Sequence, residues 1–219
     1  MSQPALERER LIRSLVADLR PVRRPGRVAH WLVTWLSLAV LFSAASILVT
    51  GPYRDGALIA LSSNFSFAAE TLVAAAAVIL LARAALKSSM PDAVRQLRWV
   101  GWPAAALCLW LGFYVVGLWF PAHPVSNLGH RDHCLAETQL LALINFVPLL
   151  WLARRLAPLR PRLTGALAGA AAAAVPASIM QFACMYEPQH ILVFHFAPMV
   201  VTAATGALLG PALLTRRFP

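Results

Sequence analysis

Long apolar stretches separated by short polar segments dominate the pattern of this chain. Six of them approach or exceed the length of about 20 apolar residues that a helix needs to cross a bilayer. They cover residues 31–50, 64–86, 99–120, 134–153, 163–184 and 190–214. The pattern therefore predicts an all-α fold, an integral membrane bundle of six transmembrane helices.

The arginines and lysines give this predicted bundle an orientation. If the amino terminus lies in the cytoplasm, the inner segments hold 17 of the 19 basic residues, and only Arg54 and Arg131 fall in outer loops. Basic residues gather on the cytoplasmic side of membrane proteins. We therefore expect a multi-pass protein of the bacterial inner membrane with both termini in the cytoplasm.

Composition narrows the possible classes of protein. With 59% hydrophobic and 13% charged residues in 219 positions, the chain is too apolar for a soluble domain. The net charge of +10 flanks the apolar stretches, where basic side chains meet anionic head groups of the lipid bilayer. We therefore expect no direct contact with nucleic acid. The expected organisation is a cytoplasmic segment, residues 1–30, followed by a transmembrane domain, residues 31–219.

The segment before the first apolar stretch has the period of an amphipathic helix over residues 5–19. Its apolar side consists of Leu11, Ile12, Leu15, Val16 and Leu19. A helix of this kind could lie on the inner membrane surface. It could equally place its apolar stripe in a groove of a cytoplasmic partner.

Reactive side chains concentrate at the predicted outer boundary. The short connection around Leu159 makes the fourth and fifth spans antiparallel neighbours, and Cys134 and Cys184 each lie 25 residues from Leu159. The two sulfurs should therefore lie at similar heights, and a disulfide is feasible if both side chains face the shared seam. Five of the six histidines accompany them: His123, His130, His133, His190 and His195.

This outer group allows several interpretations. The cysteines could form a structural disulfide, remain inert buried thiols, or act as a redox- or metal-responsive sensor. The spacing is not that of a zinc ribbon or a metalloprotease. The candidate metal ligands are His130, His133, Cys134, Cys184 and His190. The third cysteine, Cys108, is expected to be a small hydrophobic residue in the middle of the third span.

An ordered set of residues resembles the family of negative regulators of sigma F (NrsF). Along the amino-terminal segment and first outer loop, the resemblance includes Leu11, Ile12, Leu15, Asp18, Leu19, Pro21, Val22, Arg54 and Asp55. Further along it includes Cys134, Pro148, Pro158, Pro161, Gly165, Gly169, Gln181, Cys184, Pro188, His190, His195, Gly206 and Gly210. The order of these residues carries the resemblance, which covers nearly the whole chain.

The resemblance implies an anti-sigma factor rather than an enzyme, with no cofactor. Such a protein would hold an extracytoplasmic-function (ECF) sigma factor away from RNA polymerase until a stress outside the membrane is sensed. The sigma-binding part would lie at 11–19, and the signal input at Cys134 and Cys184. The competing hypotheses are a quinone-coupled thiol oxidase, a haem protein, and a small transporter using Glu70, the only acid well inside a predicted span.

Overall fold

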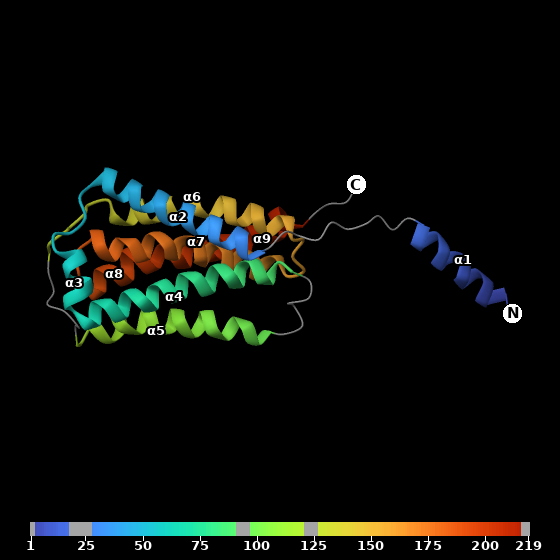
Figure 1. Cartoon of the computed structure of the whole chain (residues 1–219), viewed down its shortest axis with the longest axis horizontal. Coiled ribbons are helices and arrows are strands. Elements are labelled where there is room, and N and C mark those ends of the chain that lie inside the picture. Colours follow the sequence, from blue (N-terminus) through green and yellow to red (C-terminus); the bar gives the residue numbers. More distant parts are fainter. Residues whose placement is uncertain (1–2, 18–27, 91–96, 121–126, 216–219) are drawn as a thin grey trace.

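The computed structural model describes residues 3–17, 28–90, 97–120 and 127–215 (Figure 1). Every secondary-structure element in these residues is a helix. Five helical segments are long and apolar enough to cross a membrane. They are α2 (Val28–Thr50), α4 (Phe65–Ser88), α6 (Cys134–Arg155), α7 (Pro161–Ala183) and the continuous segment Pro188–Leu214. The protein is thus an all-helical bundle with the character of a multi-pass membrane protein.

The remaining elements are shorter. The predicted third span forms a 3-10 turn, η2 (Leu97–Val100), followed by the apolar 17-residue helix α5 (Gly101–Gly117). A short helix, α3 (Ala57–Ser63), precedes α4. The last segment consists of α8 (Pro188–Ile191), the π-helical turn η3 (Leu192–Phe196) and α9 (Ala197–Leu214). The predicted apolar segments therefore correspond closely to the observed helices, and the third is the shortest.

Helix α7 is the centre of the bundle and packs against α9, α4 and α6 (Figure 1). Its alanine run, residues 170–174, is buried. Because small side chains let helix backbones approach closely, such a run favours close packing of neighbours on several sides of one helix. The core of the protein is accordingly built around α7.

The contact between α7 and α9 is a seam of glycines. A Cβ atom placed on Gly165 would overlap the carbonyl oxygen of Gly206, and one on Gly169 would overlap that of Thr202. On α9, a Cβ on Gly206 would overlap the carbonyl oxygen of Gly165, and one on Gly210 would overlap that of Pro161. Any larger residue at these positions would push the two helices apart, so these glycines permit direct backbone-to-backbone contact.

The amino-terminal segment contains the helix α1 (Gln3–Ala17), where residues 5–19 were predicted to be helical. Its apolar stripe is exposed, from 49% at Ile12 to 61% at Leu15, with Leu11 and Val16 between. Leu19, the last residue of the predicted stripe, lies outside the described residues. The described part of the stripe is therefore uncovered by the protein's own side chains.

The two ends of the bundle differ in chemistry. We call one the basic end, because basic residues gather there, among them Arg83, Lys87, Arg154, Arg155, Arg160 and Arg162. They lie at the end of α4, at the end of α6 and around the start of α7. Cys134, Cys184, His190 and His195 lie at the opposite end, which we call the Cys/His end. This separation agrees with the predicted orientation of the helices.

Candidate functional site

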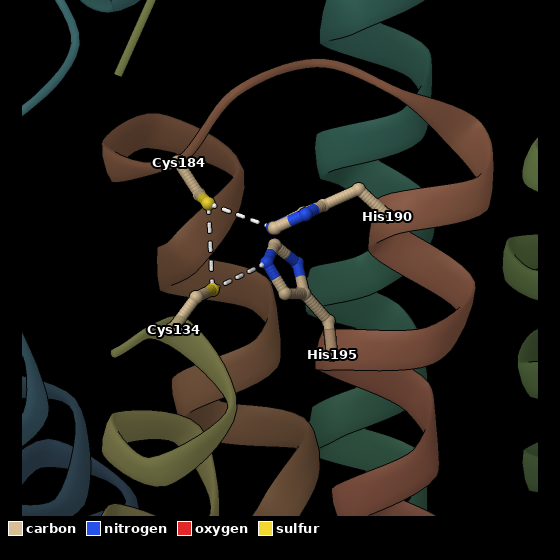
Figure 2. A group of neighbouring side chains, drawn as sticks. All are labelled: Cys134, Cys184, His190 and His195. Carbon is tan, nitrogen blue, oxygen red and sulfur yellow. Dashed lines mark hydrogen bonds between the residues drawn. The ribbon is translucent and has the colours of Figure 1, made fainter. Parts of the chain in front are cut away.

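Two cysteines and two histidines meet at the Cys/His end (Figure 2). The Sγ atoms of Cys134 and Cys184 are 3.3 Å apart. The Nε2 atom of His195 lies 3.1 Å from Cys134 Sγ, and that of His190 lies 3.1 Å from Cys184 Sγ. Each residue offers one potential metal-ligating atom, a cysteine Sγ or a histidine ring nitrogen, and these four atoms all lie within 4.8 Å of one another. Each thiol is thus paired with its own imidazole, and both cysteines are almost completely buried.

The ends of two antiparallel helices place the sulfurs. Cys134 is the first residue of α6, and Cys184 follows the last residue of α7 in an extended conformation. The equal distances along the chain from Leu159 therefore predicted their common height correctly. Both cysteines remain free thiols in this structure.

The π-helical turn explains how both histidines reach the sulfurs. Residues five positions apart in an α-helix point about 140° away from each other. A π turn instead hydrogen-bonds residue i to residue i+5, so each turn holds more residues and side chains five positions apart come closer to one side. Such turns occur often at functional sites. The turn covers residues 192–196, between His190 and the start of α9. The irregularity thus turns His190 and His195 toward the same pair of sulfurs.

The other predicted residues are placed differently. His130 lies at the edge of the group: its Nδ1 is 3.2 Å from the sulfur of Met185, and its Nε2 is 3.2 Å from Asp132. His133 is exposed at the start of α6 and is not part of the four-residue group. His123 lies outside the described residues. Cys108 is exposed on α5.

Residues outside the predicted site hold the loop that follows α7 and begins at Cys184. The sequence analysis did not assign them to the site. The Arg54 guanidinium donates a hydrogen bond to the Cys184 carbonyl over 3.5 Å, and the Arg54 backbone N–H donates one to Phe182. Gly129, at a φ of 83°, lies so close that a Cβ there would be 2.9 Å from the Ala183 carbonyl oxygen. The loop is therefore pressed against two neighbouring segments.

Tyr186, two residues after Cys184, connects this loop to the membrane-spanning helix α4. Its hydroxyl donates a hydrogen bond of 3.1 Å to Oε1 of Glu70, which is fully buried. Burial and the nearby Glu70 raise the pKa of the Tyr186 hydroxyl, which keeps it a donor. Burial lowers the pKa of Arg54, and the surrounding Cys184, Tyr186 and Glu70 act in the opposite direction. Glu70 is thus an internal hydrogen-bond acceptor behind the site.

Arg131, the second exception to the basic asymmetry, binds α2 to α6. Its guanidinium donates to the carbonyls of Ile47, Gly51 and Pro52 at the end of α2. It also forms an ion pair of 3.1 Å with Glu137 in the first turn of α6. An arginine at a helix C-terminus satisfies the last carbonyls, which otherwise lack partners. A structural requirement therefore accounts for this outer arginine.

The four-residue group supports two kinds of chemistry. Two adjacent thiols can be oxidised to a disulfide, and an imidazole within hydrogen-bond distance can accept the proton of the attacking thiol. Alternatively, two thiolates and two imidazoles form the tetrahedral donor set preferred by zinc and other thiophilic ions. Both reactions need the thiols close together, as they are here.

The chain is similar to a family of regulatory proteins. The family described as "Negative regulator of sigma F" (NrsF) matches residues 15–215. A similar protein is the "Probable anti-sigma-F factor NrsF" of Azospira oryzae (strain ATCC BAA-33 / DSM 13638 / PS). The two chains are 34% identical over 147 residues, which cover 60% of this chain and 63% of the relative. No solved structure matches.

The helical bundle and the family description together define a helical protein of membrane character in a regulatory class. More narrowly, this chain belongs to the NrsF family of negative regulators of sigma F, as its residue pattern predicted.

Proposed function

We propose that this protein is an inner-membrane anti-sigma factor whose Cys134–Cys184 pair controls release of an ECF sigma factor. The observation that carries the proposal is the pair of buried thiols 3.3 Å apart, each beside an imidazole. The family description and the name of the Azospira oryzae relative support the regulatory class. The signal is a stress in the periplasm, and the response is a change in the cytoplasm.

The proposed topology has six spans, with the Cys/His end outside and both termini in the cytoplasm. Helix α5 is shorter than the others, but 17 residues at about 1.5 Å each give about 26 Å, close to the thickness of the hydrocarbon core. The clustering of basic residues at one end of the bundle supports the cytoplasmic assignment of that end. The periplasm is oxidising, which suits reversible thiol chemistry.

Sigma binding is assigned to the amino-terminal segment, residues 1–30. The stripe formed by Leu11, Ile12, Leu15, Val16 and Leu19 supplies the contact, since its described members are exposed on α1. An amphipathic helix that leaves such a stripe uncovered fits a groove on a partner. The alternative is a helix that lies on the membrane surface, and co-purification of the sigma factor with stripe variants distinguishes the two roles.

The proposed redox step is oxidation of the two thiols to a disulfide. Cys134 and Cys184 lose two protons and two electrons and form one S–S bond, while hydrogen peroxide accepts the electrons and protons and becomes two water molecules. Formation of the bond shortens the sulfur separation from 3.3 Å to about 2.05 Å. His190 or His195 accepts the proton of the attacking thiol. The disulfide no longer has an S–H to share with either imidazole, so the loop after α7 must rearrange.

The first experiment measures thiol alkylation in cells before and after peroxide stress. We expect labelling of Cys134 and Cys184 to fall together while the sigma-dependent genes respond. Cys134→Ser, Cys184→Ser and the double variant should show the same altered response, and Cys108→Ser should behave as wild type. Unchanged labelling of both cysteines during a stress that activates the genes would contradict thiol sensing.

The second experiment measures co-purification of the sigma factor with the full-length protein. Burial of one leucine is worth about 1.5–3 kcal/mol, so Leu15→Asp should weaken capture by about tenfold or more. The triple variant Leu11→Asp, Leu15→Asp and Leu19→Asp should abolish capture. Substitution of Arg10 and Arg13 on the same helix by Gln is the control for the charged face. Undiminished capture by the triple variant would place the binding site elsewhere.

A second candidate function is direct sensing of a thiophilic metal by the same four residues, which is favoured by their S₂N₂ donor set. Addition of Cd²⁺ to the reduced, purified protein should then give a thiolate-to-metal absorption band that His190→Gln and His195→Gln each weaken. Absence of the band in wild type would exclude this second function and leave the oxidative one.

A further inference from the structure

A cavity of about 400 Å³ lies at the basic end of the bundle, between the last turns of α4 and the start of α5. Arg83 and Lys87 contribute from α4, and Trp99 and Trp102 from η2 and α5. It is distant from the four-residue group, since Arg83 and Lys87 lie near the end of α4 whereas Glu70, which lies behind that group, is near its start. The function proposed above makes no use of this cavity.

The charge of the cavity has one sign. Arg83 and Lys87 are four residues apart and therefore lie on the same face of α4. The Lys87 ammonium lies 6.0 Å from the centre of the Trp99 ring. Among the described residues, those that line the cavity include no carboxylate. Within the described part of the chain, the cavity therefore presents two cations to an anion and no competing carboxylate.

The apolar residues are ordered with respect to these cations. From the end of α4 inward, the lining residues are Lys87, then Ala84 and Arg83 one turn earlier, then Leu80. On α5, Pro103 follows Trp102. The indole of Trp102 is 73% exposed near the start of α5. Tryptophan prefers the level of the head groups at a bilayer surface. Cation, indole and aliphatic residues thus follow the same order as the phosphate, ester and acyl parts of a phospholipid.

We propose that this cavity binds one anionic phospholipid, with its phosphate between Arg83 and Lys87 and an acyl chain against Leu80 and Pro103. The planar guanidinium of Arg83 can bind two phosphate oxygens, and Lys87 supplies a compact positive charge. Basic pockets between membrane helices on the cytoplasmic side are suited to such head groups. Because residues of both α4 and α5 line the cavity, a lipid bound there would contact both helices and join the last turns of α4 to α5.

The test is native mass spectrometry of the full-length protein, delipidated in detergent and titrated with phosphatidylglycerol or phosphatidylcholine. We expect phosphatidylglycerol to bind the wild type more tightly. The double variant Arg83→Gln, Lys87→Gln should lose about tenfold or more in affinity, since each basic residue near an anionic lipid contributes measurably to binding. The control Arg160→Gln, Arg162→Gln removes two exposed cations from the same end and should bind as wild type.

Other outcomes overturn the proposal. Equal losses in the two double variants would show diffuse attraction to the whole basic end, and equal binding of both lipids would exclude recognition of net negative charge. Displacement of phosphatidylglycerol by millimolar inorganic phosphate would indicate a site for free phosphate instead. Retention of a peptide rather than a lipid after purification would identify the cavity as a protein-binding site. Thermal unfolding of both variants establishes that each is folded.

Discussion

The two ends of the bundle satisfy their polar groups in different ways. At the Cys/His end, Arg131 pairs with Glu137 and Tyr186 donates a hydrogen bond to Glu70, so these four polar side chains have partners within the chain. At the basic end, Arg154, Arg160 and Arg162 are exposed. The first arrangement fixes a site in one geometry, whereas the second leaves charges for lipid or protein partners. The proposed sensing pair thus lies at the end with a fixed geometry, and the proposed sigma-binding segment lies on the same side of the membrane as the basic end.

The largest expected effect concerns the sides of the membrane on which the two ends lie. A reporter that fluoresces only in the cytoplasm should be bright when fused after Pro219. Alkaline phosphatase, which is active only outside, should be active when fused after Gly56 in the first outer loop. Both effects are nearly all-or-none because a folded reporter does not cross the membrane. A dark but stably expressed fusion at Pro219 would reverse or break the proposed orientation.

An intermediate effect is expected on stability. Arg131→Gln should lower the free energy of unfolding by about 3 kcal/mol, because it leaves Glu137 and the carbonyls at the end of α2 without their donor. Arg160→Gln, at the basic end, should change it by less than about 0.5 kcal/mol, as an exposed substitution does. Denaturant unfolding in detergent measures both. Equal losses would show that the two ends do not differ in the way described.

The smallest effect is expected at the link between the Cys184 loop and α4. Tyr186→Phe should cost about 1–2 kcal/mol through the lost hydrogen bond to Glu70. It should also raise the rate of Cys184 alkylation several-fold by loosening the loop. Tyr53→Phe removes a comparable hydrogen bond of 2.9 Å to Ala44 at the same end and should leave that rate unchanged. An unchanged rate in Tyr186→Phe would show that this bond does not position Cys184.

The sequence predicted features that depend on chain length and apolar periodicity. The helix bounds, the basic asymmetry and the common height of Cys134 and Cys184 all belong to this kind. It did not predict which histidines face the sulfurs, because His190 and His195 point apart on a regular helix and only the π turn brings them together. His133 seemed equally suitable from its position in the sequence but is exposed.

The residues that support the site from behind could not be predicted from the sequence either. Tyr186 and Glu70 are 116 positions apart, and no local pattern joins them. One signal was available: Arg54 and Arg131 were the two residues that broke the basic asymmetry. Because a charge on the disfavoured side of a membrane needs a compensating interaction, such exceptions point to structural contacts.

The glycine seam determines which parts of the bundle can move. Since the backbones of α7 and α9 touch, they form a rigid hairpin that carries Cys184, His190 and His195 together. Cys134 belongs to α6, whose contacts with this hairpin include the Phe146 ring, whose Cζ lies 3.2 Å from the position of a Cβ on Gly206. A ring can tilt where two backbones in contact cannot slide. A change in sulfur separation would therefore be converted into a shift of α6 against a stationary hairpin, and α6 extends the full distance to the basic end.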